Sequence, residues 1–256
     1  MTAYETMIKT NHHLIRGGEL NDTEKSDIVK RLLAEQVGTV DDDRVMKQHH
    51  AYPKFFVPPR NGGKKLQPVI PMSPKTYQTA DNAYEFEIIR LLQKFMPPND
   101  KLSNMIDVTS KRLKHTCFGY KGCYHHECFD AGMVVLRFLS FAVTDDKKWI
   151  QKQLDMYNNH FHSQRRSKGI QKYYWFVLSE MPLDIAESEI WRQSEHIAEH
   201  LNGSYLIKNG NEDVALCAMR NTLARLEEYE HIKNRKPYVD EKTGRLRFNM
   251  DKREIV

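Results

Sequence analysis

Three of the four cysteines fall within residues 115–128, together with three histidines. Thiolate and imidazole groups are the ligands that zinc prefers, and four of them close a tetrahedral structural site. We therefore predict a zinc site with the ligands Cys117, Cys123, Cys128 and His126, in which His115 or His125 can replace His126. No CxxC pair is present, so the spacing departs from common zinc knuckles. The favoured alternative is that these cysteines are small apolar residues, packed where a loop enters a buried helix.

A second cluster with metal-ligand chemistry is His196-Ile197-Ala198-Glu199-His200, which matches the HxxEH motif of inverzincin peptidases. In that motif, two histidines one helical turn apart bind zinc and the glutamate activates water. The match predicts an alternative function, a zinc-dependent hydrolase with His196 and His200 as ligands and Glu199 as the catalytic residue. An open form of the cysteine cluster is another version of this alternative. On a helical wheel, however, the three side chains fall opposite the apolar face, which favours a solvated histidine pair.

Other enzymatic patterns are weaker. Arg225 and His231 have the spacing of the ribonuclease pair of HEPN domains, and Cys123 has His125 and His126 beside it as candidate bases. The sequence contains no glycine-rich phosphate loop, no dinucleotide fingerprint and no kinase signature. We therefore expect no nucleotide cofactor.

Lysine and arginine recur in short clusters, which is typical of proteins that contact phosphate groups. The predicted nucleic-acid-binding residues are Arg60, Lys64, Lys65, Lys111, Arg112, Lys114, Arg165, Arg166 and Lys168, and a fourth cluster is Arg235-Lys236. If helical hairpins stack, the clusters at 111–114 and 165–168 line up as a stripe. Faces for base stacking nearby are then offered by Tyr120, Tyr124, Tyr173 and Trp175. The alternative is that these cations only keep the protein in solution.

The bulk composition limits the class of protein. The chain has 256 residues, of which 40% are apolar, so it is long enough to bury a sizeable core. Lys and Arg number 39 against 34 Asp and Glu, and this mild excess permits nucleic-acid binding without requiring it. Four cysteines, no signal peptide and no apolar run of transmembrane length predict a cytoplasmic protein without a membrane partner.

The spacing of apolar residues predicts that helices position these clusters, in a mainly α protein. Six of the ten prolines lie in residues 51–80, where Asn61-Gly62 is typical of a hairpin turn, so we expect a small β-hairpin arm there. The polar tail is predicted to be either a hairpin or disordered. The chain thus divides into an N-terminal helical segment (1–50), a proline-rich arm (51–80), an α-helical domain (81–232) and a polar tail (233–256).

Within the α-helical domain, the pattern predicts helices near residues 82–96, 101–115, 124–143, 146–161, 170–181, 187–201 and 211–232. Asn82 followed by Glu85 is typical of a capping-box start. The segment 124–143 is apolar nearly all round, so we expect it at the centre of the core. Residues 170–181 are compatible with a strand, but helix is favoured. Alternate helices start about 41 to 46 residues apart, so the fold is either a helical bundle or a short HEAT-like helical-hairpin array.

These patterns together predict a non-catalytic helical binding or adaptor protein. Its expected partner is nucleic acid, or a protein–nucleic acid complex, bound through the basic loops, and its expected cofactor is a structural zinc. Two alternatives stay open, namely the zinc-dependent hydrolase and a purely protein-binding helical scaffold that needs neither metal nor nucleic acid.

Overall fold

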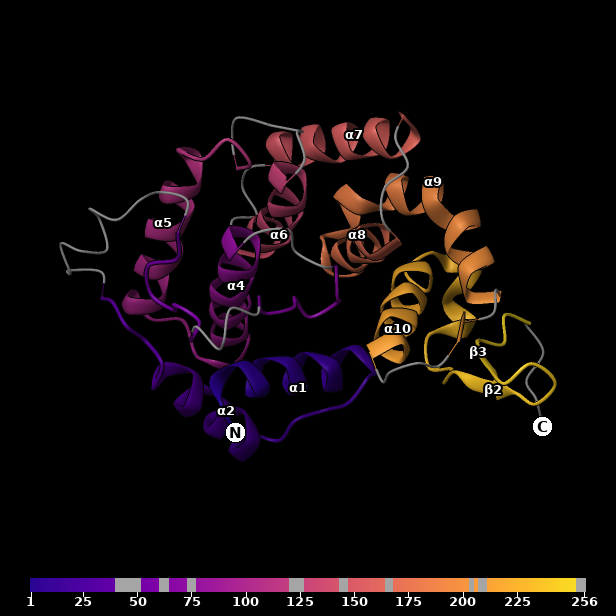
Figure 1. Cartoon of the computed structure of the whole chain (residues 1–256), viewed down its shortest axis with the longest axis horizontal. Helices are drawn as coiled ribbons and strands as arrows, with labels where there is room; N and C mark the ends of the chain where they lie inside the picture. The colour runs from indigo at the N-terminus through magenta and orange to yellow at the C-terminus, as the bar shows by residue number, and fades with distance from the viewer. Residues whose placement is uncertain are drawn as a thin grey trace.

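The computed structural model shows a mainly helical protein (Figure 1), which confirms the predicted class. It describes residues 1–39, 52–59, 65–72, 77–119, 127–142, 147–163, 168–202, 205–206 and 211–251. The helices are α1 (Ala3–Ile15), α2 (Asp22–Leu33), α4 (Tyr77–Phe95), α5 (Asp100–Lys114), α6 (Glu127–Ala142), α7 (Lys147–Ser163), α8 (Lys168–Glu180), α9 (Leu183–Asn202), α10 (Asn211–Leu223) and the 3-10 helix η1 (Glu227–Ile232). An antiparallel sheet in the order β1-β3-β2 is formed by β1 (Tyr205–Leu206), β2 (Tyr238–Asp240) and β3 (Arg245–Arg247). None of the described helices is both long and apolar enough to cross a membrane.

Alternate helices pack side by side along the centre of the molecule. α4 packs against α6, α6 against α8, and α8 against α10, while α5, α7 and α9 lie around the periphery (Figure 1). α1 crosses the base of this row, because it contacts both the first member, α4, and the last member, α10. Such alternation occurs in helical bundles as well as in hairpin arrays, so a HEAT-like repeat stays a prediction.

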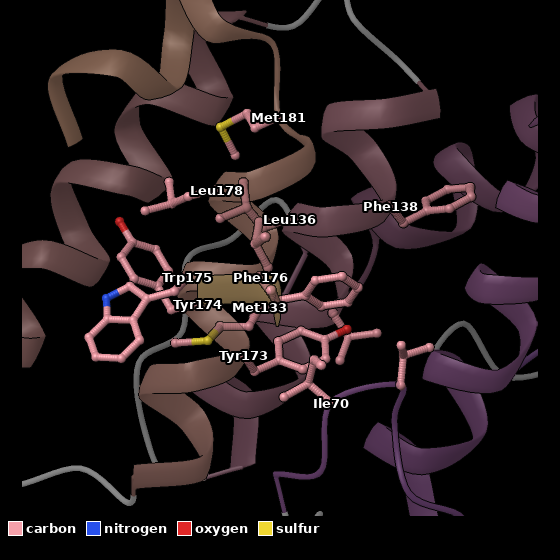
Figure 2. Close-up of a cluster of buried hydrophobic side chains, with 14 of the residues drawn as sticks. Ile70, Met133, Leu136, Phe138, Tyr173, Tyr174, Trp175, Phe176, Leu178 and Met181 are labelled. Atoms are coloured by element: carbon pink, nitrogen blue, oxygen red, sulfur yellow. The ribbon is translucent and has the colours of Figure 1, made fainter. Parts of the chain in front are cut away.

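The centre of the core is built by α6 and α8. Every residue in 129–140 of α6 is buried, which confirms the central position predicted for this helix. Residues 173–178 of α8 are also buried and are helical, so the helix interpretation of this segment is confirmed. Figure 2 shows these side chains packed with Met133 and Leu136 of α6 and with Ile70 from the proline-rich segment.

The described parts of the proline-rich segment, 52–59 and 65–72, contain no strand, and apolar residues of both parts belong to the hydrophobic core. The β-hairpin arm expected there stays a prediction. Phe55 and Ile70 are fully buried. The prolines prevent continuous ladder bonding, while the apolar residues between them supply surface that the helices cover. The predicted turn at Asn61-Gly62 lies outside the described residues.

A buried ion pair anchors α5 and the proline-rich segment to α4. The prediction that a helix begins at Asn82, with Asn82 and Glu85 as a capping box, is wrong, because α4 begins five residues earlier. Arg112 of α5 instead donates to Asn82 Oδ1 at 2.8 Å and to Glu85 Oε2 at 2.6 Å. The other oxygen of Glu85 accepts the backbone N–H groups of Lys54 and Phe55 at 2.7 Å each. Burial, together with the nearby Arg112, lowers the pKa of the Lys54 amine to about 8, although Glu85 opposes this shift.

A second buried charge cluster joins α4, α6 and α8. Arg137 of α6 pairs with Glu87 of α4 and, at 2.7 Å, with Glu180 of α8. Arg90 of α4 pairs with the same two carboxylates at 3.1 and 2.7 Å. The guanidinium of Arg137 also lies over the ring of Phe176, 4.1 Å from its centroid. Burial opposes ionisation of Glu180, but Arg137 and Arg90 outweigh it and hold the pKa of this carboxyl below its ordinary value.

The C-terminal region differs from the single long helix predicted at residues 211–232. α10 ends at Leu223, and η1 follows after a break in the helix. The tail forms a hairpin, which is one of the two alternatives predicted for it. β2 and β3 pair through a turn in which Gly244 has a φ of +62°, and β1 pairs with the other edge of β3.

Candidate functional site

Two of the predicted zinc ligands, one after the end of α5 and one in the first turn of α6, lie close together. The sulfur atoms of Cys117 and Cys128 are 3.4 Å apart. Two thiolates of a tetrahedral zinc site lie about 3.8 Å apart, so this pair needs to open by only a few tenths of an ångström. Cys123 and His126, the other predicted ligands, lie outside the described residues. Among the residues that are described, no group of three or more His, Cys, Asp or Glu side chains is placed to hold a metal.

Of the two cysteines of this cluster that the structure describes, the packing interpretation applies to Cys128. Cys128 packs against the hydrophobic core, whereas Cys117 is exposed. A thiol that faces solvent beside one that is half-buried can accept a metal from solution, which a fully enclosed pair cannot.

The HxxEH motif lies mainly on the exposed side of α9. The side chains of His196 and Glu199 are 56% and 77% exposed, and His196 Nδ1 lies 3.8 Å from Glu199 Oε2. His200 Nδ1 donates to the backbone carbonyl of His196 at 2.8 Å, and its ring packs edge-on against buried Trp175 with 4.8 Å between centroids. The three side chains form no metal-binding group with any other described residue. Solvent exposure of His196 and Glu199 is the arrangement expected from the helical wheel.

The predicted nucleic-acid-binding residues are dispersed in the structure. Lys111 pairs with Asp107 at 2.7 Å on the exposed side of α5, and Lys114 is exposed at the end of the same helix. Lys65 is half-buried and lies elsewhere, with its amine 5.9 Å from the ring centroid of Tyr77. Residues outside the described part of the chain are Arg60, Lys64, Arg165 and Arg166, and the side chain of Lys168 is not described either.

Arg112 and two of the aromatic residues are core residues, which corrects their assignment to a nucleic-acid surface. Arg112 is 3% exposed, and its guanidinium is bound to Glu85, so it does not face phosphate in solution. Its position on α5 explains this, because neighbours on a helix point about 100° apart and only one side of α5 faces α4. Tyr173 and Trp175 are buried in α8, and the other stacking candidates, Tyr120 and Tyr124, lie outside the described residues.

A cationic site that the sequence clusters did not predict forms where α1, α10 and the segment after η1 meet. A cavity of about 520 Å³ lies there, lined by His13, Arg16, Gly17, Gly18, Cys217, Arg220, Lys236 and Pro237, and we call it the cationic cavity. Three of these residues, Arg16, Arg220 and Lys236, carry a positive charge. None of the described residues that line it is acidic.

Two glycines shape the α1 wall of the cationic cavity. Gly17 has a φ of +85°, and its N–H donates to the Leu14 carbonyl at 3.0 Å, which ends the helix. The Gly18 N–H donates to the His13 carbonyl at 2.9 Å. A Cβ on Gly18 would lie 2.3 Å from the His13 ring, so a larger residue would displace this ring. The glycine thereby allows His13 Nε2 to hydrogen-bond with the Glu19 carbonyl at 3.0 Å.

Arg220 is held by hydrogen bonds that join the three walls of the cationic cavity. Its Nη1 donates to the Arg235 carbonyl at 2.5 Å, while Nε and Nη2 donate to Asn221 Oδ1 at 3.0 and 2.6 Å. Asn221 Nδ2 in turn donates to the Ile15 carbonyl of α1 at 2.8 Å. The guanidinium also lies 5.8 Å from the ring centroid of Phe248. Arg220 is only 3% exposed, so a permanent charge is fixed in the wall.

Two further hollows continue from the cationic cavity along η1. The adjoining cavity, of about 590 Å³, shares Gly17 and Arg220 with it and adds, among its charged lining residues, Arg225, Lys233, Glu227 and Glu230. The Trp191 hollow beyond is lined by Trp191, Glu227, Glu228, Glu230 and His231. The described lining is therefore most positive in the cationic cavity, more balanced in the adjoining cavity, and acidic in the Trp191 hollow.

Arg225 and His231, the pair with ribonuclease-like spacing, face different hollows. Arg225 lines the adjoining cavity, and its Nη1 donates to the Leu178 carbonyl at 2.5 Å. His231 lines the Trp191 hollow, and its Nε2 hydrogen-bonds with the Met250 carbonyl at 3.1 Å. Both side chains are thus committed to separate backbone groups.

The geometry of the cationic cavity suits binding of an anion, because a fixed guanidinium and two exposed cations share one space. The sequence indicated one part of this cavity, because Arg235-Lys236 is a basic cluster and Lys236 lines the cavity. Arg16 and Arg220 are isolated in the sequence, and only the docking of α1 on α10 brings them together. Comparison with known proteins identifies no family, because no family model matches the chain and no curated protein or solved structure matches it either.

Proposed function

We propose that this protein is a non-catalytic helical binding protein that engages nucleic acid, alone or within a protein–nucleic acid complex, through its cationic cavity. The observation that supports the proposal is the gathering of Arg16, Arg220 and Lys236 around one cavity whose described lining holds no carboxylate. Arginine and lysine bind phosphate through charge-assisted hydrogen bonds, and release of counterions from the nucleic acid adds to the affinity. The excess of 39 Lys and Arg over 34 Asp and Glu attracts such a ligand at longer range.

A double variant, Arg16→Ala with Lys236→Ala, is expected to weaken binding to a single-stranded oligonucleotide and to flatten its salt dependence. Each lost phosphate contact lowers the slope of log affinity against log salt by about 0.7, so the double variant should lose about 1.4. Both residues are exposed, so the fold should persist. Fluorescence anisotropy between roughly 50 and 200 mM salt measures the slope.

Two other double variants serve as controls for this experiment. Lys101→Ala with Lys148→Ala removes two exposed lysines of α5 and α7 and should leave the slope almost unchanged. Lys111→Ala with Lys114→Ala tests the cluster predicted from the sequence. A larger loss in this second control would move the binding surface to α5. Absent or salt-independent binding in the parent would exclude the nucleic-acid proposal and favour the protein-binding scaffold.

The geometry of the HxxEH motif does not favour the zinc-dependent hydrolase. Its motif has two exposed side chains, His196 and Glu199, and a third, His200, whose Nδ1 is bound to a backbone carbonyl. A catalytic zinc needs three converging protein ligands and a second shell that orients them.

We also propose that Cys117 and Cys128 hold a structural zinc, with Cys123 and His126 as the remaining ligands. The 3.4 Å separation of the two sulfurs supports this proposal. Thiolate zinc sites persist where cysteines stay reduced, so the proposal places the protein in the cytoplasm.

Cys117→Ser is expected to lose about one zinc per chain and to lower the melting temperature, because binding of a structural zinc contributes directly to folding. Elemental mass spectrometry on untagged protein measures the metal content of the parent and the variant. His200→Ala provides the comparison and should keep the metal. Loss of zinc with His200→Ala alone would instead support the hydrolase, and a parent without zinc would remove the proposed site.

A further inference from the structure

The cationic cavity differs from a surface that only follows the backbone of a nucleic acid. A strand lying on such a surface meets its cations in a row, whereas Arg16, Arg220 and Lys236 line one common space. An internal phosphodiester brings one negative charge. A phosphate monoester brings about 1.5 to 2 negative charges at pH 7 and three acceptor oxygens. Three cations around one space are balanced more nearly by a monoester than by a diester, and they equal its three acceptor oxygens in number.

The size of the cationic cavity fits a single nucleotide. Its volume of about 520 Å³ is within the range of roughly 300 to 1,000 Å³ that small-molecule sites occupy. Cys217 and Pro237 provide an apolar part of the wall, against which a sugar or base can pack.

Arg220 is oriented before any ligand binds. Its hydrogen bonds to the Arg235 carbonyl and to Asn221 fix the guanidinium, so little side-chain entropy is lost on binding. The C-terminal end of α1 opposes an anion, since the end of a helix carries about half a negative charge. Two carbonyls at this end already accept the N–H groups of Gly17 and Gly18, and three full positive charges outweigh what remains.

We propose that the cationic cavity recognises the terminal phosphate monoester of a nucleic-acid strand. Arg220 presents a fixed charge to the phosphate, while the exposed side chains of Arg16 and Lys236 approach it from α1 and from the segment after η1. This inference rests on the nucleic-acid binding proposed above and names the part of the ligand that the cavity takes. A 5′ and a 3′ phosphate share this chemistry, so the experiment tests both.

The experiment compares three single-stranded oligonucleotides of one sequence, which carry a 5′ phosphate, a 3′ phosphate or hydroxyl groups at both ends. Each strand has an internal fluorophore, and binding to the full chain is followed by anisotropy at about 100 mM salt. One phosphorylated strand is expected to bind at least tenfold more tightly than the hydroxyl strand, which corresponds to about 1.4 kcal/mol. Arg16→Ala and Lys236→Ala should each remove most of this difference.

Lys233→Ala is the matched control, because Lys233 is exposed, lines the adjoining cavity and is not among the described residues that line the cationic cavity. Loss of this charge should weaken binding of the three strands by a similar factor and leave the ratio of their affinities unchanged. Melting temperatures of the three variants establish that each of them is folded.

Equal affinity for the three strands, with salt dependence retained, would overturn the terminal-phosphate inference and leave nucleic-acid binding in place. Failure of all three strands to bind would overturn both. A preference for a phosphorylated strand that persists in Arg16→Ala and in Lys236→Ala would place the phosphate outside the cationic cavity, and this result would also overturn the inference.

Discussion

Arg137→Ala is expected to lower the free energy of unfolding by about 3 to 5 kcal/mol. The substitution removes the guanidinium that bridges Glu87 of α4 and Glu180 of α8 in the centre of the fold. Arg90 remains, but one arginine must then balance two carboxylates in a largely buried site. The contact with the Phe176 ring is lost as well. Chemical denaturation followed by circular dichroism measures the change in free energy.

An exposed ion pair provides the control for this prediction. Lys111→Ala breaks a pair with Asp107 that is equally short, but the charges lie in solvent, so its loss should cost less than about 1 kcal/mol. Combining Arg137→Met with Glu180→Gln removes opposite charges together and should recover part of the stability that Arg137→Ala loses. A loss below about 1 kcal/mol for Arg137→Ala would show that the cluster does not hold the three central helices together.

The same cluster gives the protein a defined response to acid. The pKa of Glu180 is lower in the folded state than its ordinary value of 4.5. Its contribution to stability is therefore complete above that value and is lost as the pH falls through the folded pKa. The difference in stability between the parent and Arg137→Ala should accordingly narrow in acid.

Glu85→Ala is expected to have an effect of similar size, about 3 to 5 kcal/mol. It leaves the guanidinium of Arg112 in the core without its carboxylate partner, because Arg112 and Glu85 are 3% exposed and fully buried, respectively. It also removes the acceptor for the backbone N–H groups of Lys54 and Phe55. Chemical denaturation measures the loss of stability as for Arg137→Ala.

Limited proteolysis distinguishes the two buried clusters from each other. Glu85→Ala should accelerate cleavage within residues 52–59, because this stretch loses its anchor on α4. Arg137→Ala, which acts on the central helices, should not favour cleavage at that position. Glu85→Gln keeps a carbonyl acceptor at the same place and should protect residues 52–59 better than Glu85→Ala. Equal cleavage of these residues in the parent and in Glu85→Ala would contradict the anchoring role.

The features of the fold that were predicted correctly depend on neighbours along the chain. The central position of α6 and the helical state of residues 173–178 follow from apolar residues spaced within one segment. The start of α4 was predicted wrongly, because Asn82 and Glu85 have the residue types and spacing of a cap. Their actual partner, Arg112, lies 30 and 27 residues further along the chain. Local pattern carries no information about a contact at that distance.

The candidate sites also differ in whether they depend on residues that are close in the chain or far apart in it. The approach of Cys117 to Cys128 was predictable, since the two residues are 11 positions apart in the chain. The cationic cavity was not, because Arg16 and Arg220 are isolated in the sequence and meet only through tertiary packing. Arg112 was assigned to the surface because it belongs to the basic cluster at 111–114, but it is a core residue, and membership of a cluster does not show which of its side chains is buried.

The hydrogen bond from Asn221 to the Ile15 carbonyl spans 206 positions of the chain, and it connects the wall of the cationic cavity to the end of α1. A ligand that contacts Arg16 and Arg220 together therefore joins α1 to α10. Detachment of α1 from α10 would separate Arg16 from Arg220 and release the ligand. Binding of the ligand and docking of α1 on α10 are therefore thermodynamically linked. At a ligand concentration 100-fold above the dissociation constant, this linkage stabilises the form with α1 docked on α10 by about 2.7 kcal/mol.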